Sequence, residues 1–330
     1  MKSKIHLAKY LMLLALVAAP AAVAQDSLFL LVNPEPNEQL IKIDADAMYY
    51  GDASADKRRD DLSMARYSLN ATALFPNGTE AETSEWIFSA DISVLDTSGE
   101  LRLPRSRTRV PGELYDYSIG GAYRTFLDNG WLVGGQLRVG QATDDPFESF
   151  DEAYLNGLLF ARIPQGQYTA WLLFLSADNR REWPVLPGVA FQFPISKTKW
   201  FVIGVPVSAA GGKIGDRIEY SVMYIMMTRA SAKVSYDATE TVRIFAAYDW
   251  NKESYLLADR RDSDDRFVYS EQRVSGGVEW DITESFFLKA EGGYAFDRSF
   301  AEGEDDDDED DTRLDIDSGW FAGLSATVRF

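Results

Sequence analysis

The sequence predicts an all-β protein, a closed antiparallel transmembrane β-barrel of about 14 strands within a range of about 12–16. Three observations predict it. The chain begins with an export signal, apolar residues then recur at almost every second position, and short and long polar connections alternate between these stretches. Hydrocarbon offers backbone amides no hydrogen-bond partner, so strands that cross a membrane must close into a barrel.

The N-terminal segment has the features of a signal peptide. Three lysines precede an apolar run of 15 residues that ends in Ala22-Val23-Ala24. A membrane-spanning helix needs about 20 residues, so an uncleaved anchor is disfavoured and cleavage before Gln25 is expected. The sequence therefore divides into a signal peptide over 1–24, a periplasmic N-terminal segment over 25–38 and a barrel over 39–330.

Composition excludes several functions. Without the predicted signal the chain has 30 basic and 52 acidic side chains, a net charge of −22, so nucleic acid is not an expected partner. Cysteine is absent, which removes disulfides, a lipid-anchor cysteine and thiolate sites, and the single histidine, His6, lies in the signal. We therefore expect no enzyme, no catalytic residues, no cofactor and no metal ligand set, since common hydrolase and metal sites use histidine. Carboxylate pairs such as Glu271 and Glu279 are weak acid–base candidates.

Alternation is clearest along 319–330, where each second residue from Trp320 to Phe330 is apolar. A soluble β-sandwich also alternates, but it turns charged residues outward to water. Here one face stays apolar or small, and charges of both signs share the other face, as in a barrel with a polar lumen. Six tryptophans fall near predicted strand ends, where an aromatic girdle would lie: Trp86, Trp131, Trp200, Trp250, Trp280 and Trp320.

The connections predict orientation. Tight turns at 128–130, 165–166, 196–198, 237–239 and 281–283 are expected in the periplasm, and longer connections such as 97–112, 251–265 and 298–318 outside. Segment 216–237 is long for one strand but keeps one outward parity. Splitting it, with Ala209–Gly215 as a further strand, would give about 16 strands. The predicted strands are 39–50, 60–75, 83–96, 113–127, 130–142, 151–164, 167–178, 187–195, 199–207, 216–237, 241–250, 266–281, 284–297 and 319–330.

Charged residues of both signs lie on the predicted inner face. They could line a pore and set its selectivity, or they could pair as salt bridges that hold a narrow barrel together, and the sequence leaves both interpretations open. The predicted lumen-lining residues are Lys42, Asp44, Arg66, Asp91, Arg124, Arg138, Arg217, Glu219, Lys233, Arg243, Glu271, Arg273, Lys289, Glu291 and Arg329.

The last long connection, 298–318, is strongly acidic. Nine of the ten residues from Glu302 to Asp311 carry a carboxylate. Like charges repel, so we expect a disordered, solvated tip of an extracellular loop. Carboxylate oxygens suit Ca²⁺, but the EF-hand spacing is missing, so any Ca²⁺ binding would be weak and non-stoichiometric.

Two resemblances add to this interpretation. The final strand, with alternate apolar residues and terminal Phe330, resembles the signal that Gram-negative barrel-assembly machinery recognises. Over about 186–300, the segments Gly204-Val205-Pro206, Arg273–Gly277 and Gly292–Arg298 resemble an outer-membrane family known only as a domain of unknown function. These resemblances imply the outer membrane of a Gram-negative bacterium, with outer-membrane lipid and the assembly machinery as partners. They imply no activity.

The sequence therefore supports two hypotheses of function. The first is a passive barrel or small channel whose acidic mouth favours cations through the local field. The second is a structural or surface-binding barrel whose lumen is plugged by side chains. Catalysis is disfavoured because the mature chain has no histidine.

Overall fold

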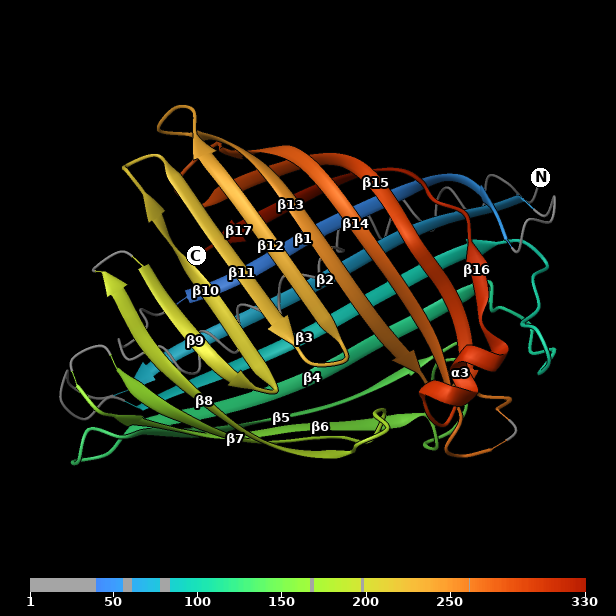
Figure 1. Ribbon diagram of the computed structural model, residues 1–330, viewed down its shortest axis with the longest axis horizontal. Helices are drawn as coiled ribbons and strands as arrows, with labels where there is room; N and C mark the ends of the chain where they lie inside the picture. The colour runs from blue at the N-terminus through green and yellow to red at the C-terminus, as the bar shows by residue number, and fades with distance from the viewer. Residues whose placement is uncertain (1–39, 56–60, 78–83, 167–168, 197–198, 261) are drawn as a thin grey trace.

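One antiparallel sheet, closed on itself, makes up the fold (Figure 1). The computed structural model describes residues 40–55, 61–77, 84–166, 169–196, 199–260 and 262–330. Closure is made by β1, which pairs with β2 on one side and with the C-terminal strand β17 on the other. The predicted signal peptide and the predicted segment 25–38 lie outside the described residues.

Each strand is followed by its neighbour in the barrel. The three-residue β16 pairs with β15 alone among the described strands, so sixteen of the seventeen strands form the wall. The strands are β1 (Leu40–Ser54), β2 (Asp61–Asn77), β3 (Ser84–Ser98), β4 (Glu113–Phe126), β5 (Leu132–Thr143), β6 (Ala153–Pro164), β7 (Ala170–Asp178), β8 (Val185–Ser196), β9 (Lys199–Val205), β10 (Val207–Ile214), β11 (Ile218–Ile225), β12 (Arg229–Asp237), β13 (Val242–Tyr255), β14 (Arg266–Asp281), β15 (Phe286–Gly303), β16 (Leu314–Ile316) and β17 (Gly319–Arg329).

The closed all-β barrel is confirmed, but the count of fourteen strands is wrong. Segment 216–237 is a hairpin, β11 and β12, and the glycine-rich stretch before it is β10, as the sixteen-strand alternative requires. The turn between β11 and β12, Met226-Met227-Thr228, contains none of the usual turn residues. Ile225 pairs with Arg229, so three residues separate the paired positions and the outward parity continues unbroken through the turn.

Four of the predicted tight turns, at 128–130, 165–166, 237–239 and 281–283, lie at one end of the barrel, here called the turn end, and the predicted long connections lie at the opposite end. The fifth, 196–198, lies mostly outside the described residues. The opposite end also carries the helix α3 (Asp306–Thr312), and we call it the α3 end. Among the described residues, no helix is long and apolar enough to cross a membrane.

The two faces of the wall differ as predicted. Outward residues such as Ile119, Leu137 and Leu324 expose 65%, 54% and 58% of their surface, whereas residues of the opposite parity are mostly buried. Trp86, Trp280 and Trp320 point outward and are exposed, but Trp200 packs inside the barrel, beside Gly211. Trp200 is therefore not part of an outer girdle.

The wall is much lower on one side. β9 to β12 contain only 7 to 9 residues each, whereas β13, β14 and β15 contain 14, 16 and 18. A strand rises about 3.3 Å per residue, so the difference is large. In Figure 1 the β9–β10 and β11–β12 hairpins end well short of α3, whereas β13 to β15 continue to it. We call β9 to β12 the low wall.

Two neighbouring glycines in β15 allow a test of the tight curvature. A Cβ added to Gly293 would overlap the carbonyl oxygen of Val274 and lie 2.8 Å from the Cα of Ser275. At Gly292 the nearest atom would be the carbonyl oxygen of Phe321, at an ordinary 3.6 Å. We predict that Gly293→Ala lowers the free energy of unfolding by about 1–3 kcal/mol, the usual cost of overpacking, and that Gly292→Ala changes it little. Urea unfolding followed by tryptophan fluorescence checks this, and equal stabilities would contradict it.

Candidate functional site

A cavity of about 340 Å³ lies inside the barrel, and we call it the chamber. Strands β3 to β7 and the β7–β8 connection supply one side of it, and the tips of the low wall and the end of β13 supply the other. Most of the side chains that line the chamber are polar or charged, with apolar side chains between them. Its lining includes Asp91, Ser118, Arg138, Asn156, Phe174, Ser176, Asp178, Val207, Ile225 and Glu253.

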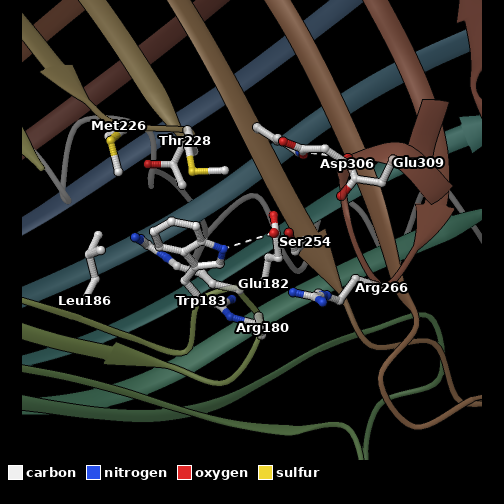
Figure 2. A pocket seen from close by; sticks show the side chains of 13 residues that line it. Arg180, Glu182, Trp183, Leu186, Met226, Thr228, Ser254, Arg266, Asp306 and Glu309 are labelled. Atoms are coloured by element: carbon white, nitrogen blue, oxygen red, sulfur yellow. Dashed lines mark hydrogen bonds and ion pairs between the residues drawn. The ribbon is translucent and has the colours of Figure 1, made fainter.

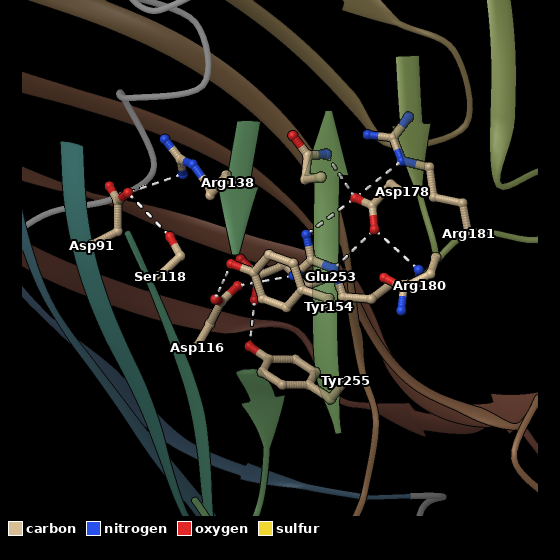
Figure 3. A network of polar contacts seen from close by, with 12 residues as sticks. Asp91, Asp116, Ser118, Arg138, Tyr154, Asp178, Arg180, Arg181, Glu253 and Tyr255 are labelled. Carbon is tan, nitrogen blue, oxygen red and sulfur yellow. Dashed lines mark hydrogen bonds and ion pairs between the residues drawn. The ribbon is translucent and has the colours of Figure 1, made fainter. Parts of the chain in front are cut away.

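The charged groups of the chamber are paired across strands (Figure 3). Arg138 of β5 lies 3.0 Å from the carboxylate of Asp91 of β3. Asp178, at the end of β7, accepts hydrogen bonds from Asn156 at 3.0 Å and from Arg180 at 3.1 Å. Such pairing is required because an isolated charge away from water is costly.

Arg180 is the centre of this network. It lies in the β7–β8 connection, donates to Asp116 at 3.3 Å, and stacks 3.5 Å above the ring of Tyr154, which itself donates to Asp116 at 2.9 Å. Burial of the guanidinium favours a lower pKa, but the carboxylates of Asp178 and Asp116 outweigh it and raise the pKa of Arg180. Arg180 therefore holds the β7–β8 connection against the chamber wall.

Some side-chain contacts join strands that are not neighbours in the wall. Arg66 of β2 donates to Glu253 of β13 at 2.8 Å, although four wall strands separate them. Tyr50 of β1 donates to Glu271 of β14 at 2.9 Å, across two strands. These contacts join separate parts of the wall inside the barrel.

The β13–β14 connection extends this closure. The amide of Leu256 donates to the carbonyl oxygen of Ala142 of β5 at 2.7 Å. Seven wall strands lie between β5 and β13 in either direction, so this hydrogen bond joins opposite sides of the barrel.

An apolar cluster fills the α3 end of the barrel. It includes inward side chains of the long strands together with side chains of the β3–β4 and β13–β14 connections, which fold inward. Several of its members are completely or almost completely buried. The direct route along the barrel axis is therefore closed at this end. Its members include Tyr50, Leu95, Leu101, Leu103, Leu114, Leu257, Phe267, Phe300, Leu314 and Phe321.

A second hollow lies above the low wall, and we call it the notch (Figure 2). The β7–β8 connection, the β11–β12 turn, the ends of β13 and β14, and α3 surround it. Arg180 and Arg181 line both the notch and the chamber, so this arginine pair separates the two spaces. The notch is lined by Arg180, Arg181, Glu182, Trp183, Leu186, Met226, Met227, Thr228, Lys252, Ser254, Arg266, Asp306 and Glu309.

The acidic segment is not a disordered loop, because 306–312 form α3. The carboxylate of Asp305 caps the helix by accepting from the amide of Asp308 at 3.0 Å. Lys252 of β13 binds Asp306 at 2.8 Å and Glu309 at 2.7 Å. Burial raises the pKa of Glu309, although Lys252 opposes this rise. Carboxylates in the first turn also interact favourably with the helix dipole, which offsets part of the repulsion between the acidic side chains.

No metal site is apparent in the part of the chain that the structure describes, where no three acidic or histidine side chains are arranged to hold an ion. Weak Ca²⁺ binding by the acidic segment stays a prediction.

Most predicted lumen residues lie on the inward parity and have charged partners. Arg217 differs, because it lies exposed in the β10–β11 turn and donates to Tyr236. Glu219 is exposed on the inward parity of β11, and Arg329 lies 4.4 Å from the ring of Phe287. The other predicted lumen residues form these ion pairs: Lys42–Asp44, Arg66–Glu253, Arg124–Glu85, Arg138–Asp91, Lys233–Glu279, Arg243–Glu279, Arg273–Glu271 and Lys289–Glu291.

Several chamber and notch residues were missed by the sequence reasoning. Asp116 and Asp178 occupy inward positions of predicted strands, so the alternation could have identified them. The sequence pattern places Glu253 in a loop, because the predicted strand ends at Trp250, whereas β13 continues to Tyr255. Arg180 and Arg181 lie in a connection, where alternation carries no signal.

The contact between Arg66 and Glu253 can be tested against an exposed ion pair. The side chain of Arg66 is 8% exposed, whereas Arg105 and its partner Asp311 are 67% and 56% exposed. We predict that Glu253→Ala lowers the free energy of unfolding by about 3 kcal/mol, because it leaves a buried guanidinium unpaired. Arg105→Ala should cost less than about 1 kcal/mol. Urea unfolding measures both, and similar losses for the two variants would contradict the prediction.

Comparison with known proteins gives matches of fold alone. No protein family and no curated protein matches the chain, so the resemblance to an uncharacterised family stays a prediction. The solved structures that resemble it include an outer-membrane channel from Pseudomonas putida F1, with 11% identity over 90% of this chain and 98% of that chain and a TM-score of 0.37. They also include the translocator domain of the autotransporter NalP from Neisseria meningitidis (10% identity, 94% and 96% covered, TM-score 0.33) and OccK7 of Pseudomonas aeruginosa (8%, 89% and 99%, 0.37). At such values the likeness is one of barrel architecture only.

Proposed function

We propose that this chain is an outer-membrane barrel of a Gram-negative bacterium, exported by its predicted signal peptide and assembled through its C-terminal strand. The closed sheet leaves no unpaired edge, and its outward residues form an apolar surface suited to hydrocarbon. β9, the shortest wall strand, has 7 residues, fewer than the about 9–11 of a typical tilted transmembrane strand, so the bilayer would have to thin beside it. Outer-membrane lipid and the assembly machinery are the partners that this location implies.

In that membrane we propose a small channel that opens sideways instead of along its axis. The observation that carries this proposal is the pairing of a polar chamber with a notch above the low wall, separated by Arg180 and Arg181. The axis itself is filled by the apolar cluster at the α3 end. A solute from outside would therefore pass the arginine pair to reach the chamber.

Charge selectivity would be determined at the notch. The acidic α3 borders it, which is the basis for the cation preference that the sequence suggests. However, Lys252 binds two of the α3 carboxylates, and Arg180, Arg181 and Arg266 line the same hollow. The notch therefore does not carry a clear negative excess, and cation selectivity stays a hypothesis to be measured by reversal potential.

A second candidate function is a closed barrel that binds a partner at its surface. The contacts that cross the barrel and the apolar cluster favour it, because they close the α3 end. A deletion of Glu302–Asp317 would also remove Leu314 and Ile316 from the buried cluster and so disturb the fold. Substituting the exposed carboxylates Asp307, Asp308 and Asp310 by asparagine would test surface binding with the fold intact. Catalysis is not part of either proposal.

Cysteine chemistry can test the sideways channel, because the natural chain has no cysteine. Ser176 lines the chamber, whereas Ser68 is 1% exposed inside the barrel and does not line it. We predict that a methanethiosulfonate reagent added from outside modifies Ser176→Cys and lowers unitary conductance in planar bilayers by about half or more, by occluding the path. Ser68→Cys should not respond. A folded protein that never conducts under varied voltage and salt would contradict the channel.

The position of the opening needs a separate variant. Thr228 lies at the notch, whereas Thr241 lies in an exposed turn at the other end of the barrel. We predict that Thr228→Trp lowers the conductance by about half or more, because the ring fills the notch, and that Thr241→Trp leaves it unchanged. Single-channel recording measures both variants. Full conductance in Thr228→Trp would place the opening elsewhere.

A further inference from the structure

The β11–β12 turn presents apolar side chains where a turn usually presents glycine or a small polar residue. Met227 has a φ of 65°, in the left-handed region, and its side chain is exposed. A bulky residue adopts that conformation at a cost in free energy, and such strain often accompanies function. The methionine side chain is also flexible and polarisable, so it adapts to apolar ligands of varied shape.

Other apolar groups surround the same hollow. Trp183, in the β7–β8 connection, exposes 56% of its surface, and Leu186 and Met226 line the notch beside it. Figure 2 shows Trp183 and Leu186 on one side of the hollow and Met226 on the other. The notch therefore has an apolar part formed by the connections of the low wall.

The opposite part of the notch holds a buried cationic group, Arg266, which interacts electrostatically with Glu309 but makes no direct contact with a carboxylate among the described residues. Arg266 is 8% exposed, its Nε has no hydrogen-bond partner, and its terminal nitrogen donates to the carbonyl oxygen of Glu304. Among the described residues it forms no ion pair. In Figure 2 its guanidinium points from β14 toward Arg180 and Trp183. A buried donor without a partner is costly, so a ligand that supplies an acceptor is favoured there.

Arg181 is the second cationic group of the notch that can accept a further anionic partner. Its contact with Asp178 is long, at 3.7 Å, and Asp178 already accepts from Arg180 and Asn156. Burial lowers the pKa of Arg181, and the Asp178 carboxylate, which acts to raise this pKa, does not outweigh the effect of burial. By contrast, Lys252 is fully engaged with α3. Glu182 opposes an anion, but it is exposed to solvent and accepts from the indole nitrogen of Trp183 at 3.0 Å.

We propose that the notch binds an amphipathic monoanion, with its carboxylate or phosphate between Arg181 and Arg266 and its apolar body against Trp183, Leu186 and Met227. Guanidinium groups suit such anions because their planar N–H groups match two oxygens. This inference rests on the proposed function, since it names the solute class that would meet the arginine pair before the chamber. The same chemistry is offered by a soluble organic acid and by an acidic lipid of the surrounding leaflet.

The test measures binding directly, apart from conductance. Full-length protein in phosphatidylcholine vesicles is dialysed against radiolabelled 4-phenylbutyrate, with 4-phenylbutanamide as the uncharged probe and protein-free vesicles as the blank. The acid should bind about tenfold more tightly than the amide, and Arg181→Gln and Arg266→Gln should each remove most of this difference. Arg217→Gln is the matched control, because Arg217 is an exposed arginine at the other end of the barrel.

Met227→Gly separates a ligand contact from a structural role. Glycine adopts a positive φ freely, so this variant should raise the midpoint of urea unfolding while it weakens 4-phenylbutyrate binding several-fold. Gel mobility of unheated samples shows that each variant is folded. If Arg266→Gln does not fold, Arg181→Gln and Met227→Gly still decide the question.

The outcomes are distinct. Equal binding of acid and amide, or an Arg217→Gln variant as impaired as Arg181→Gln, would overturn the anion site. Competition by phosphatidylglycerol in the vesicles would support the site and identify a lipid as its source, whereas binding unaffected by that lipid would support a soluble acid. Conductance without any ligand, measured in parallel, shows whether the channel itself fails, so the two proposals can fail separately.

Discussion

The pairing of the first strand with the last is the interaction on which the rest of this structure depends. Ile41 and Phe330 exchange backbone hydrogen bonds of 3.2 and 2.9 Å, and from there β1 and β17 remain paired to Tyr50 and Phe321. Without this seam the sheet would keep two open edges, and the unpaired amides could not be accommodated in hydrocarbon. Closure also brings β1 and β2 close to β13 and β14. Tyr50 can therefore reach Glu271, and Arg66 can reach Glu253.

The sequence predicts the wall better than it predicts the interior. Alternation identifies which face of a strand is apolar, because that property repeats every two residues. It does not detect the β11–β12 hairpin, because a turn of three residues with two methionines neither breaks the parity nor contains a turn former. Nor does it predict α3, since Lys252, which pairs with Asp306 and Glu309 of this helix, lies more than fifty positions earlier in the chain.

Of the two interpretations left open for the inward charges, paired salt bridges describe most of them. The side chains of Arg124 and Glu85 are fully buried and lie 2.7 Å apart, and Arg66 binds Glu253 across four intervening strands. The chamber shows that paired charges and free space coexist, because the pairs lie along its wall. The connections between the strands determine where the chamber opens. This information could not come from alternation, since Arg180, Arg181 and Met227 lie outside the strands.

The unequal height of the wall has a consequence for the surrounding lipid. In a bilayer, β13 to β15 would extend beyond the hydrocarbon, whereas β9 to β12 would fall short of its thickness. The bilayer beside the low wall must then become thinner, or the barrel must tilt. Either adjustment costs roughly a fraction of a kcal/mol per ångström of mismatch. The deformation would be confined to one sector of the perimeter, so this barrel would have a preferred direction within the plane of its membrane.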